Sequence, residues 1–308
     1  MDNRPPLIVI LGPTAVGKTE LSLRLAERFG GEIVSADSRL FYRGMDIGTA
    51  KPTLAERRRV PHHLIDVSNP DQTWSLSVFQ AEAKQVIADI HARGKLPFLV
   101  GGTGQYITAV TDNWIPPAQA PDERLRKALE DWAAEVGKLG LYERLAVLDP
   151  EAAKKIDYHN VRRTIRALEV IFKTGKKFSE QRQKTSSPYR VLKLGLDRPR
   201  DELYQRVDAR IAQMLADGFA GEVHKLLDAG YAANLPTMSA IGYREMCAYL
   251  QGTMSLDEAV AQMKRLTRVY VRRQGTWFKE DAADITWLVM SDQVEEEAVA
   301  KIQQFLEN

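Results

Sequence analysis

The segment from Gly12 to Thr19, GPTAVGKT, constrains the fold of this chain more than any other feature. It matches the phosphate-binding pattern G-x-x-x-x-G-K-[ST] at every fixed position. The apolar, β-branched run at 7–11 before it predicts a buried strand. Leu21, Leu25 and Phe29 after it recur at a four-residue spacing, which predicts an amphipathic helix. A strand and a helix on either side are the context that this motif requires, so the sequence predicts a site for a di- or triphosphate.

Different residues of the loop are expected to contact different parts of the phosphate group. Glycines let the backbone approach an anion closely, and the loop N–H groups and the helix N-terminus point at it. We expect Lys18 to reach the outer phosphate and the Thr19 hydroxyl to bind a Mg²⁺ ion. The alternative, a chance glycine-rich turn, is disfavoured by the flanking strand and helix. The residues assigned to the diphosphate are Gly12, Pro13, Thr14, Ala15, Val16, Gly17, Lys18 and Thr19.

Strands alternate with helices in the first third of the chain. Strands are predicted at 32–36, 63–67 and 96–100, and a helix at 77–93. This alternation predicts an α/β fold with a parallel sheet, in which ligands bind at the carboxyl ends of the strands. Asp37 and the turn at 101–103 follow two of these strands, so we expect both to lie near the phosphate loop.

A proline-rich segment marks a domain boundary. Three prolines fall between 116 and 121, the patterns from 122 to 175 are helical, and a strand returns at 189–196. We therefore predict an all-helical domain at 118–189, inserted into a P-loop NTPase-like core formed by 1–117 and 190–308. The C-terminal part of the core is predicted to hold helices at 201–216, 219–229, 239–251, 255–280 and 293–307, with an edge strand near 285–289.

Basic residues cluster locally in a chain whose net charge is only +2. Twelve Lys or Arg residues lie between 154 and 193, opposed by three acidic residues. Arg265, Arg268 and Arg272 fall on one face of the helix at 255–280. Such clusters favour nucleic-acid binding, because neutralising phosphates is the main source of that affinity. The alternative for each cluster is an ordinary solvated helix surface.

Composition excludes several other classes. No apolar run approaches the length of about 20 residues that a membrane-spanning helix needs. Cys247 is the only cysteine, which excludes internal disulfides and cysteine-based metal clusters. The N-terminal residues lead directly into the first strand, so we expect no signal peptide and a cytoplasmic protein. We also expect a monomer.

Several further motifs, in order from residue 12 to 278, resemble the tRNA dimethylallyltransferase (tRNA isopentenyltransferase) family. The most specific is DSRLFYRGMDIGTAKP at 37–52, supported by PHHLID at 61–66, GGTGQY at 101–106, RALEV at 166–170, IGYREM at 241–246 and RQGTWF at 273–278. Leu40 departs from the family, where many members carry Gln at this position, and Gly104 and Gln105 vary from the commoner bulkier pair. We expect these departures to affect how the RNA base is recognised.

The resemblance implies an activity and its partners. Members of the family transfer the dimethylallyl group of dimethylallyl diphosphate to N6 of the adenosine 3′ of the anticodon, in tRNAs that read codons starting with U. The resemblance also implies Mg²⁺ and a helical insertion that grips the anticodon stem-loop. Pyrophosphate is then the leaving group, and the phosphate loop would stabilise the charge that grows on it.

Three residues outside the loop are candidates for the chemistry. Adenine N6 is a weak nucleophile, so a carboxylate that removes its proton is needed, and Asp37 fits by position and by family motif. Thr103 is the next candidate contact to the reacting base. The resemblance implies that Arg206 clamps the diphosphate. The structural alternatives are a turn aspartate at Asp37 and a surface ion pair at Arg206.

The family motifs also suggest which residues contact tRNA. The target adenosine must turn out of its stack to reach the loop, and contacts to neighbouring nucleotides offset that cost. The candidates are Asp37, Ser38, Arg39, Leu40, Gly104, Arg126, Asn160, Val161, Arg162, Arg163, Thr164, Arg166, Gly242, Tyr243, Arg244, Arg272, Arg273 and Gln274.

Two other functions remain open from the residues alone. A small-molecule or nucleoside kinase would use the same phosphate loop. A non-catalytic, nucleotide-dependent RNA-binding protein would explain the basic helices without a role for Asp37.

Overall fold

The computed structural model describes residues 2–72, 74–115, 122–181, 183–184, 186–275, 277–278 and 282–307. The chain forms two compact units, one comprising Met1–Thr111 with Ser187–Asn308 and the other Asp112–Ser186. We call them the core unit and the inserted unit and describe each by itself.

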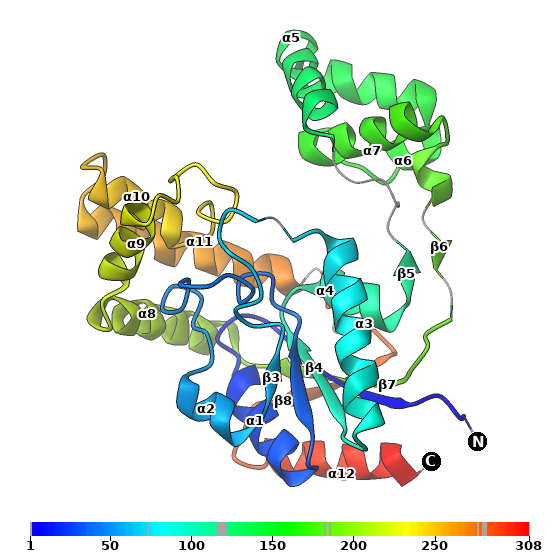
Figure 1. Ribbon diagram of the computed structural model, residues 1–308, viewed down its shortest axis with the longest axis vertical. Helices are drawn as coiled ribbons and strands as arrows, with labels where there is room; N and C mark the ends of the chain where they lie inside the picture. The colour runs from blue at the N-terminus through cyan, green and yellow to red at the C-terminus, as the bar shows by residue number, and fades with distance from the viewer. Residues whose placement is uncertain are drawn as a thin grey trace. The chain divides into compact units, whose positions relative to one another are not determined.

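A six-stranded parallel sheet in the order β3-β2-β4-β1-β7-β8 is the centre of the core unit (Figure 1). The first strand in the chain, β1, is central, because β4 pairs with it on one side and β7 on the other. β8 is the edge strand predicted near 285–289. The strands are β1 (Pro6–Leu11), β2 (Glu32–Ser35), β3 (His62–His63), β4 (Pro97–Gly101), β7 (Arg190–Asp197) and β8 (Ile285–Val289).

Helices pack on this sheet and on one another. α1 contacts α12 and the strands, α3 contacts α4 and the strands, and α8 contacts α9 and α11. Side chains define several helix starts: Thr53, Ser75 and Asn160 each accept a hydrogen bond from a backbone N–H of the first turn. The helices of the core unit are α1 (Lys18–Arg28), α2 (Leu54–Arg59), α3 (Leu76–Ala92), α4 (Gly104–Thr111), α8 (Arg200–Ala216), α9 (Phe219–Asp228), α10 (Tyr243–Leu250), α11 (Leu256–Gly275) and α12 (Val294–Glu307).

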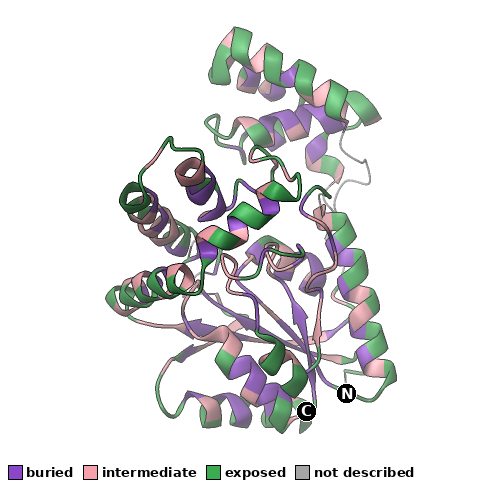
Figure 2. Ribbon diagram, turned by 60° about the vertical axis from the view of Figure 1, so that its left-hand side comes forward, coloured by how far each residue is buried: buried purple, intermediate pink, exposed green. Residues whose placement is uncertain are grey.

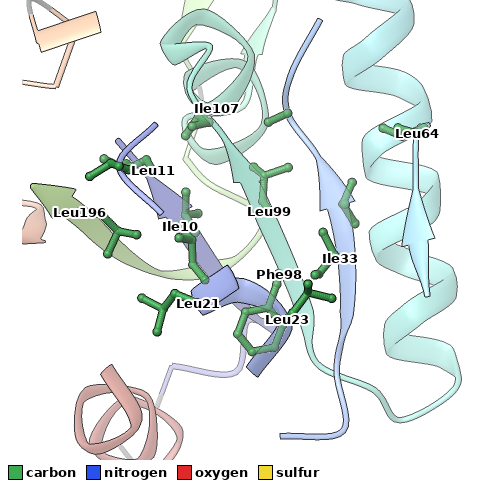
Figure 3. Packing of buried hydrophobic residues seen from close by; sticks show 14 of the residues in the cluster. Ile10, Leu11, Leu21, Leu23, Ile33, Leu64, Phe98, Leu99, Ile107 and Leu196 are labelled. Carbon is green, nitrogen blue, oxygen red and sulfur yellow. The ribbon is translucent and has the colours of Figure 1, made fainter. Parts of the chain in front are cut away.

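The apolar core forms where the strands meet α1 and α4. Ile10, Leu21, Phe98 and Ile107 are at most 2% exposed and come from four different elements (Figure 3). The central strands β1, β2 and β4 are buried along most of their length, whereas the helices expose one side to solvent (Figure 2). Burying apolar surface contributes about 25 cal/mol of folding free energy per Å². This core therefore stabilises the sheet that carries the loops at its carboxyl end.

Three loops meet at that end of the sheet. The phosphate loop follows β1, Asp37 follows β2 and Thr103 follows β4. A Cβ added at Gly101 would lie 2.4 Å from the carbonyl oxygen of Ala36. Only glycine permits this approach, so the Gly101 position brings the loop after β4 against the loop that carries Asp37.

The inserted unit has a small core of its own. It contains a two-stranded antiparallel ladder, β5 (Trp114–Ile115) with β6 (Gln183–Lys184), together with α5 (Glu123–Leu148), α6 (Pro150–Ala153), α7 (Val161–Thr174) and a short 3₁₀ helix at Phe178–Gln181. Gly137 adopts a φ of 75° inside α5 and kinks it. Leu141, Leu145 and Leu168 are fully buried between these helices.

The structure differs from the sequence-based prediction in several places. The inserted unit begins at Asp112 and ends at Ser186 rather than spanning 118–189, and it is not all-helical, because β5 and β6 belong to it. Two-residue strands carry no readable periodicity. The strand predicted at 63–67 is β3, which ends at His63 because Leu64 and Asp66 have φ values of 58° and 57° that no strand accommodates.

Helix limits also differ. α2 and α4 were not predicted, and α10 begins at Tyr243 instead of 239 because Gly242, at a φ of 98°, starts it. α11 ends at Gly275, and the predicted extension to 280 lies partly outside the described residues. No helix in the described part of the chain is long and apolar enough to cross a membrane.

Candidate active site

The side chain of Lys18 forms hydrogen bonds within the phosphate loop. α1 begins at Lys18, after Gly17 with a φ of 118°. Lys18 Nζ donates hydrogen bonds to the carbonyl oxygens of Gly12 at 3.0 Å and Pro13 at 2.8 Å. Desolvation lowers the pKa of Lys18 to about 8, against the opposing effect of the Asp37 carboxylate. A phosphate group that replaced the two carbonyls would therefore gain a strongly desolvated cation.

A cavity of about 500 Å³ opens over this loop. Besides the loop, its charged lining includes Asp37, Lys51, Arg206 and Arg210. Lys51 is already paired, at 2.5 Å with Asp46 and 2.6 Å with Asp66. Glu20 and Glu56 also line the cavity, but Glu20 pairs with Arg24 and Glu56 is hydrogen-bonded to Thr53 at the start of α2. Lys18, Arg206 and Arg210 have no ion-pair partner among the described residues, so these three cations and Asp37 are the charges open to a ligand. We call this space the phosphate cavity.

A second, more apolar cavity of about 340 Å³ adjoins it. Thr14, Asp37, Thr49 and Arg210 line both cavities. The apolar wall of the second cavity comes from helices α8 and α11 and the segment before α10, through Val207, Ile211, Met214, Ile241 and Met263. We call it the apolar cavity.

Asp37 stands at the border of the two cavities. Its Oδ1 accepts a hydrogen bond from the backbone N–H of Arg39 at 3.0 Å, and its carbonyl oxygen accepts from Leu40 N–H at 3.2 Å. Asp37 is therefore a turn aspartate, the structural alternative considered for it, and also lines a site. The second carboxylate oxygen has no hydrogen-bond donor among the described residues, so it is available to a ligand.

Thr103 and Tyr270 line the apolar cavity together with Asp37. Burial raises the pKa of the Tyr270 hydroxyl to about 12, and the Asp37 carboxylate contributes to the shift. The sequence analysis did not select Tyr270 as a site residue. It is 38% exposed, and its lining of the cavity was not predicted.

Helix α8 supplies two arginines to the phosphate cavity. Arg206 Nε donates to the carbonyl oxygen of Ala15 at 2.7 Å, which ties α8 to the phosphate loop. Arg210, which the sequence analysis did not select, lies one helical turn further on. The four-residue spacing from Arg206 was the available signal, since residues i and i+4 share a helix face.

Two residues predicted to contact tRNA are buried, and their side chains form hydrogen bonds within the protein. Gln274 is 4% exposed and hydrogen bonds to the backbone of Thr14 and Gly102. Tyr243 is fully buried, and its hydroxyl donates to Glu222 at 2.6 Å. The polar atoms of these two side chains already have protein partners, so their contact with tRNA stays a prediction that the hydrogen bonds of this structure do not favour.

The other candidates of the core unit lie at or near the cavities. Ser38 and Arg39 line the apolar cavity, while Leu40 lines the phosphate cavity. Gly104 lies beneath Trp277, whose side chain a Cβ at this position would meet at 2.9 Å. Three candidates on helices α10 and α11, Arg244, Arg272 and Arg273, are exposed, whereas Gly242 is buried at the start of α10.

In the inserted unit a buried carboxylate organises two of the candidate arginines. Glu169 is fully buried and accepts hydrogen bonds from Arg126 and Arg166. Burial alone would raise the pKa of Glu169, but the Asp122 N–H and the two guanidinium groups hold it below its usual range. Arg126 and Arg166 are thereby fixed in place.

The N-terminus of α7 carries the remaining candidates. Asn160 caps α7 by accepting a hydrogen bond from Arg163 N–H, and Arg162 is exposed beside it. Val161 is half-buried. Thr164 is only 1% exposed and bonds to the Asn160 carbonyl, so its side chain faces the protein rather than a ligand.

Comparisons with known proteins identify the family. A model described as IPP transferase matches residues 40–281. A tRNA dimethylallyltransferase from Roseiflexus sp. (strain RS-1) is 52% identical over 98% of this chain and 99% of its own. The chain belongs to the IPP transferase family.

Solved structures of IPP transferases share the fold. The tRNA isopentenylpyrophosphate transferase of Bacillus halodurans has a TM-score of 0.72 and 43% identity, covering 99% of this chain and 96% of its own. A eukaryotic dimethylallyltransferase acting on tRNA has a TM-score of 0.84 and 30% identity, covering 99% of this chain and 80% of its own. The predicted P-loop core with a parallel sheet is thus confirmed for this chain.

Proposed function

We propose that this protein transfers the dimethylallyl group of dimethylallyl diphosphate to N6 of the adenosine 3′ of the anticodon, in tRNAs that read codons starting with U. The observation that carries the proposal is the junction of the two cavities at Asp37. One cavity is cationic and built on a phosphate loop, and the other is apolar. A diphosphate ester of a short hydrocarbon needs both environments side by side.

The reaction breaks the bond between the allylic carbon and the diphosphate oxygen. The electron pair stays with that oxygen, N6 forms the new bond to carbon, and the N6 proton passes to a base. Lys18, the loop N–H groups and Arg206 stabilise the charge that grows on the diphosphate. The two side chains cost no reorganisation at that moment, because the core already holds their helices in place.

Asp37 is the base in this proposal. Its free carboxylate oxygen borders the apolar cavity, and the hydrogen bond from Arg39 N–H holds the carboxyl group in one orientation. Proton removal as the bond forms is the remedy for a nucleophile whose lone pair is delocalised into the ring. Thr103 lines the same cavity and would contact the base.

Mg²⁺ fits the residues present. No group of three or more His, Cys, Asp or Glu side chains in the described ranges forms a metal cage. Thr19 lines the phosphate cavity, and Mg²⁺ is typically held by one or two protein oxygens together with substrate phosphates and water. When bound there through Thr19, the ion would neutralise charge on the diphosphate.

The tRNA is bound by surfaces of both units in this proposal. Arg162 is exposed at the start of α7, and Arg244, Arg272 and Arg273 are exposed on α10 and α11. Arginine binds phosphates and stacks on bases, which suits a target that must leave its stack.

The experiment that tests this function is incubation with labelled dimethylallyl diphosphate and unmodified tRNA, followed by analysis of the nucleosides. We expect label on N6-dimethylallyladenosine at one position per tRNA, with release of pyrophosphate. The rival is a P-loop kinase for a small molecule or nucleoside. ATP-dependent phosphorylation of a small acceptor, with no prenylated adenosine, would establish the rival instead.

A further inference from the structure

Arg210 occupies a position that no other cation in the described site shares. Of the residues that line both cavities, Asp37 is the anion and Arg210 is the cation. Arg206, one turn earlier on α8, lines the phosphate cavity and not the apolar one. A group bound at the border of the cavities would therefore meet Arg210.

The Arg210 guanidinium has no fixed partner in the described part of the chain. The other cations of the phosphate cavity are held: Lys18 by two carbonyl oxygens, Arg206 by the Ala15 carbonyl and Lys51 by two aspartates. No hydrogen bond or ion pair to a described residue holds Arg210. It is attracted by the Asp37 carboxylate, and the nearby Arg206 repels it.

The Arg210 side chain is half-buried, and burial lowers its pKa. A guanidinium presents five N–H donors in a rigid fork, and those of Arg210 have no acceptor among the described residues. Donors that the protein leaves unused at the border of two cavities suit an anionic ligand, because hydrogen bonds to a charged acceptor are strong.

We propose that Arg210 binds the diphosphate of the prenyl donor from the side that faces the apolar cavity. This proposal rests on the proposed function. It adds Arg210 to the phosphate loop and Arg206 as a third group that binds the diphosphate. On that side lies the oxygen that bridges phosphorus and the allylic carbon. When the carbon–oxygen bond breaks, the electron pair remains on that oxygen. The Arg210 N–H groups donate to it and no proton is transferred.

Binding of inorganic pyrophosphate with Mg²⁺, measured by calorimetry, tests the proposal without turnover. We expect Arg210→Gln to weaken pyrophosphate binding by about 10- to 100-fold, the usual effect of removing a charge-assisted hydrogen bond. Arg210→Lys keeps the charge without the fork, so its affinity should be intermediate. The matched control is Arg200→Gln, at the start of the same helix and lining neither the phosphate nor the apolar cavity, which should bind as the wild type does.

Thermal unfolding separates this role from a structural one. Because Arg210 has no partner among the described residues, Arg210→Gln should leave the midpoint of the ligand-free protein unchanged or raise it. The upward shift that pyrophosphate causes should shrink. Unchanged pyrophosphate affinity in Arg210→Gln would overturn the proposal, as would a lowered ligand-free midpoint with an unchanged pyrophosphate-induced shift. If the wild type binds pyrophosphate and still forms no prenylated adenosine, the proposed function fails while the role of Arg210 as an anion ligand is still measured.

Discussion

The side-chain oxygen of Gln274 accepts a hydrogen bond from the backbone N–H of Thr14 at 2.8 Å, although the two residues are 260 positions apart. The side-chain nitrogen of Gln274 donates to the Gly102 carbonyl at 3.0 Å. One amide from α11 thus joins the phosphate loop to the turn that follows β4. The C-terminal helices therefore help to shape a loop whose sequence signature lies wholly near the N-terminus.

Replacing Gln274 with leucine should disturb the phosphate loop. Gln274→Leu leaves the Thr14 N–H and the Gly102 carbonyl without their partner, which costs about 1–3 kcal/mol of unfolding free energy. The KM for dimethylallyl diphosphate should rise, and the tRNA affinity should stay unchanged because the side chain is buried. Urea unfolding and steady-state kinetics measure these quantities. Gln262→Leu on the same helix is the control; weaker tRNA binding at full stability would return Gln274 to the RNA interface.

Replacing Asp37 with asparagine should separate chemistry from local structure. Asn keeps an oxygen that accepts the Arg39 N–H bond, so the turn should survive. It cannot take a proton from N6, and turnover should fall by about 10²- to 10⁴-fold. Binding of tRNA and of pyrophosphate should change little. Asp71→Asn, at an exposed position, is the control. An Asp37→Asn enzyme with nearly normal kcat would show that another group removes the proton.

The affinity for pyrophosphate should fall as the pH rises above about 8. The pKa of Lys18 is lowered from 10.5 to about 8 in the ligand-free protein, so above that pH Lys18 is increasingly neutral and binding of an anion must take up a proton. The effect on folding has the opposite sign. Burial of the charged lysine opposes folding fully below pH 8, and that penalty is relieved as the pH rises toward 10.5.

Calorimetry at pH 9 in two buffers of different ionisation enthalpy measures this proton uptake. Pyrophosphate exchanges protons of its own on binding, so the wild type is compared with Lys18→Met under the same conditions. The wild type should take up more protons than Lys18→Met at pH 9, and the difference between the two should vanish at pH 6.5. Equal proton uptake by the wild type and Lys18→Met at pH 9 would mean that Lys18 keeps its proton there.

Glu222 should prove to be a positioning residue for one wall of the site. Its carboxylate accepts hydrogen bonds from the backbone N–H groups of Asp46, Ile47 and Gly48 and from the Tyr243 hydroxyl. Glu222→Ala frees the segment at 46–50, part of which lines the two cavities, so unfolding free energy should fall by several kcal/mol and the KM for the donor should rise.

Tyr243→Phe is the matched comparison, because it removes one of the four donors to Glu222 and leaves the loop bonds. It should cost only about 1 kcal/mol, with little change in KM. Both variants are compared by urea unfolding and by donor titration. Equal effects of the two changes would contradict the role given to the backbone N–H groups of the loop.

Neutralising Arg162 and Arg163 should weaken tRNA binding. The double change to glutamine removes cations at the start of α7 without touching the buried Glu169 and the two arginines that it holds. The slope of log affinity against log salt should become shallower by about 0.7–0.9 for each tRNA phosphate that the enzyme no longer neutralises. Lys127→Gln, which breaks only an exposed ion pair on α5, is the control. An unchanged slope would remove α7 from the interface.

The sequence alone determined the features whose causes are local. The phosphate loop is such a feature, because a strand, a glycine turn and a helix N-terminus follow one another within a few residues. The alternation of strands and helices likewise predicted the parallel sheet, and the positions of Asp37 and Thr103 at strand ends followed from it. The charge cluster and prolines located the inserted unit to within about six residues at its start and about three at its end.

The tertiary structure alone decided which polar groups are free. Gln274, Tyr243, Arg244 and Arg272 were all predicted from the sequence to contact tRNA. In the structure Gln274 and Tyr243 are buried with protein partners, whereas Arg244 and Arg272 are exposed. Arg206 and Arg210 were equally visible on one helix face, but only folding against the phosphate loop gave Arg206 a carbonyl partner and left Arg210 without one among the described residues. The physical reason is that hydrogen-bond satisfaction and desolvation depend on groups far apart in the chain, which no local pattern of residues records.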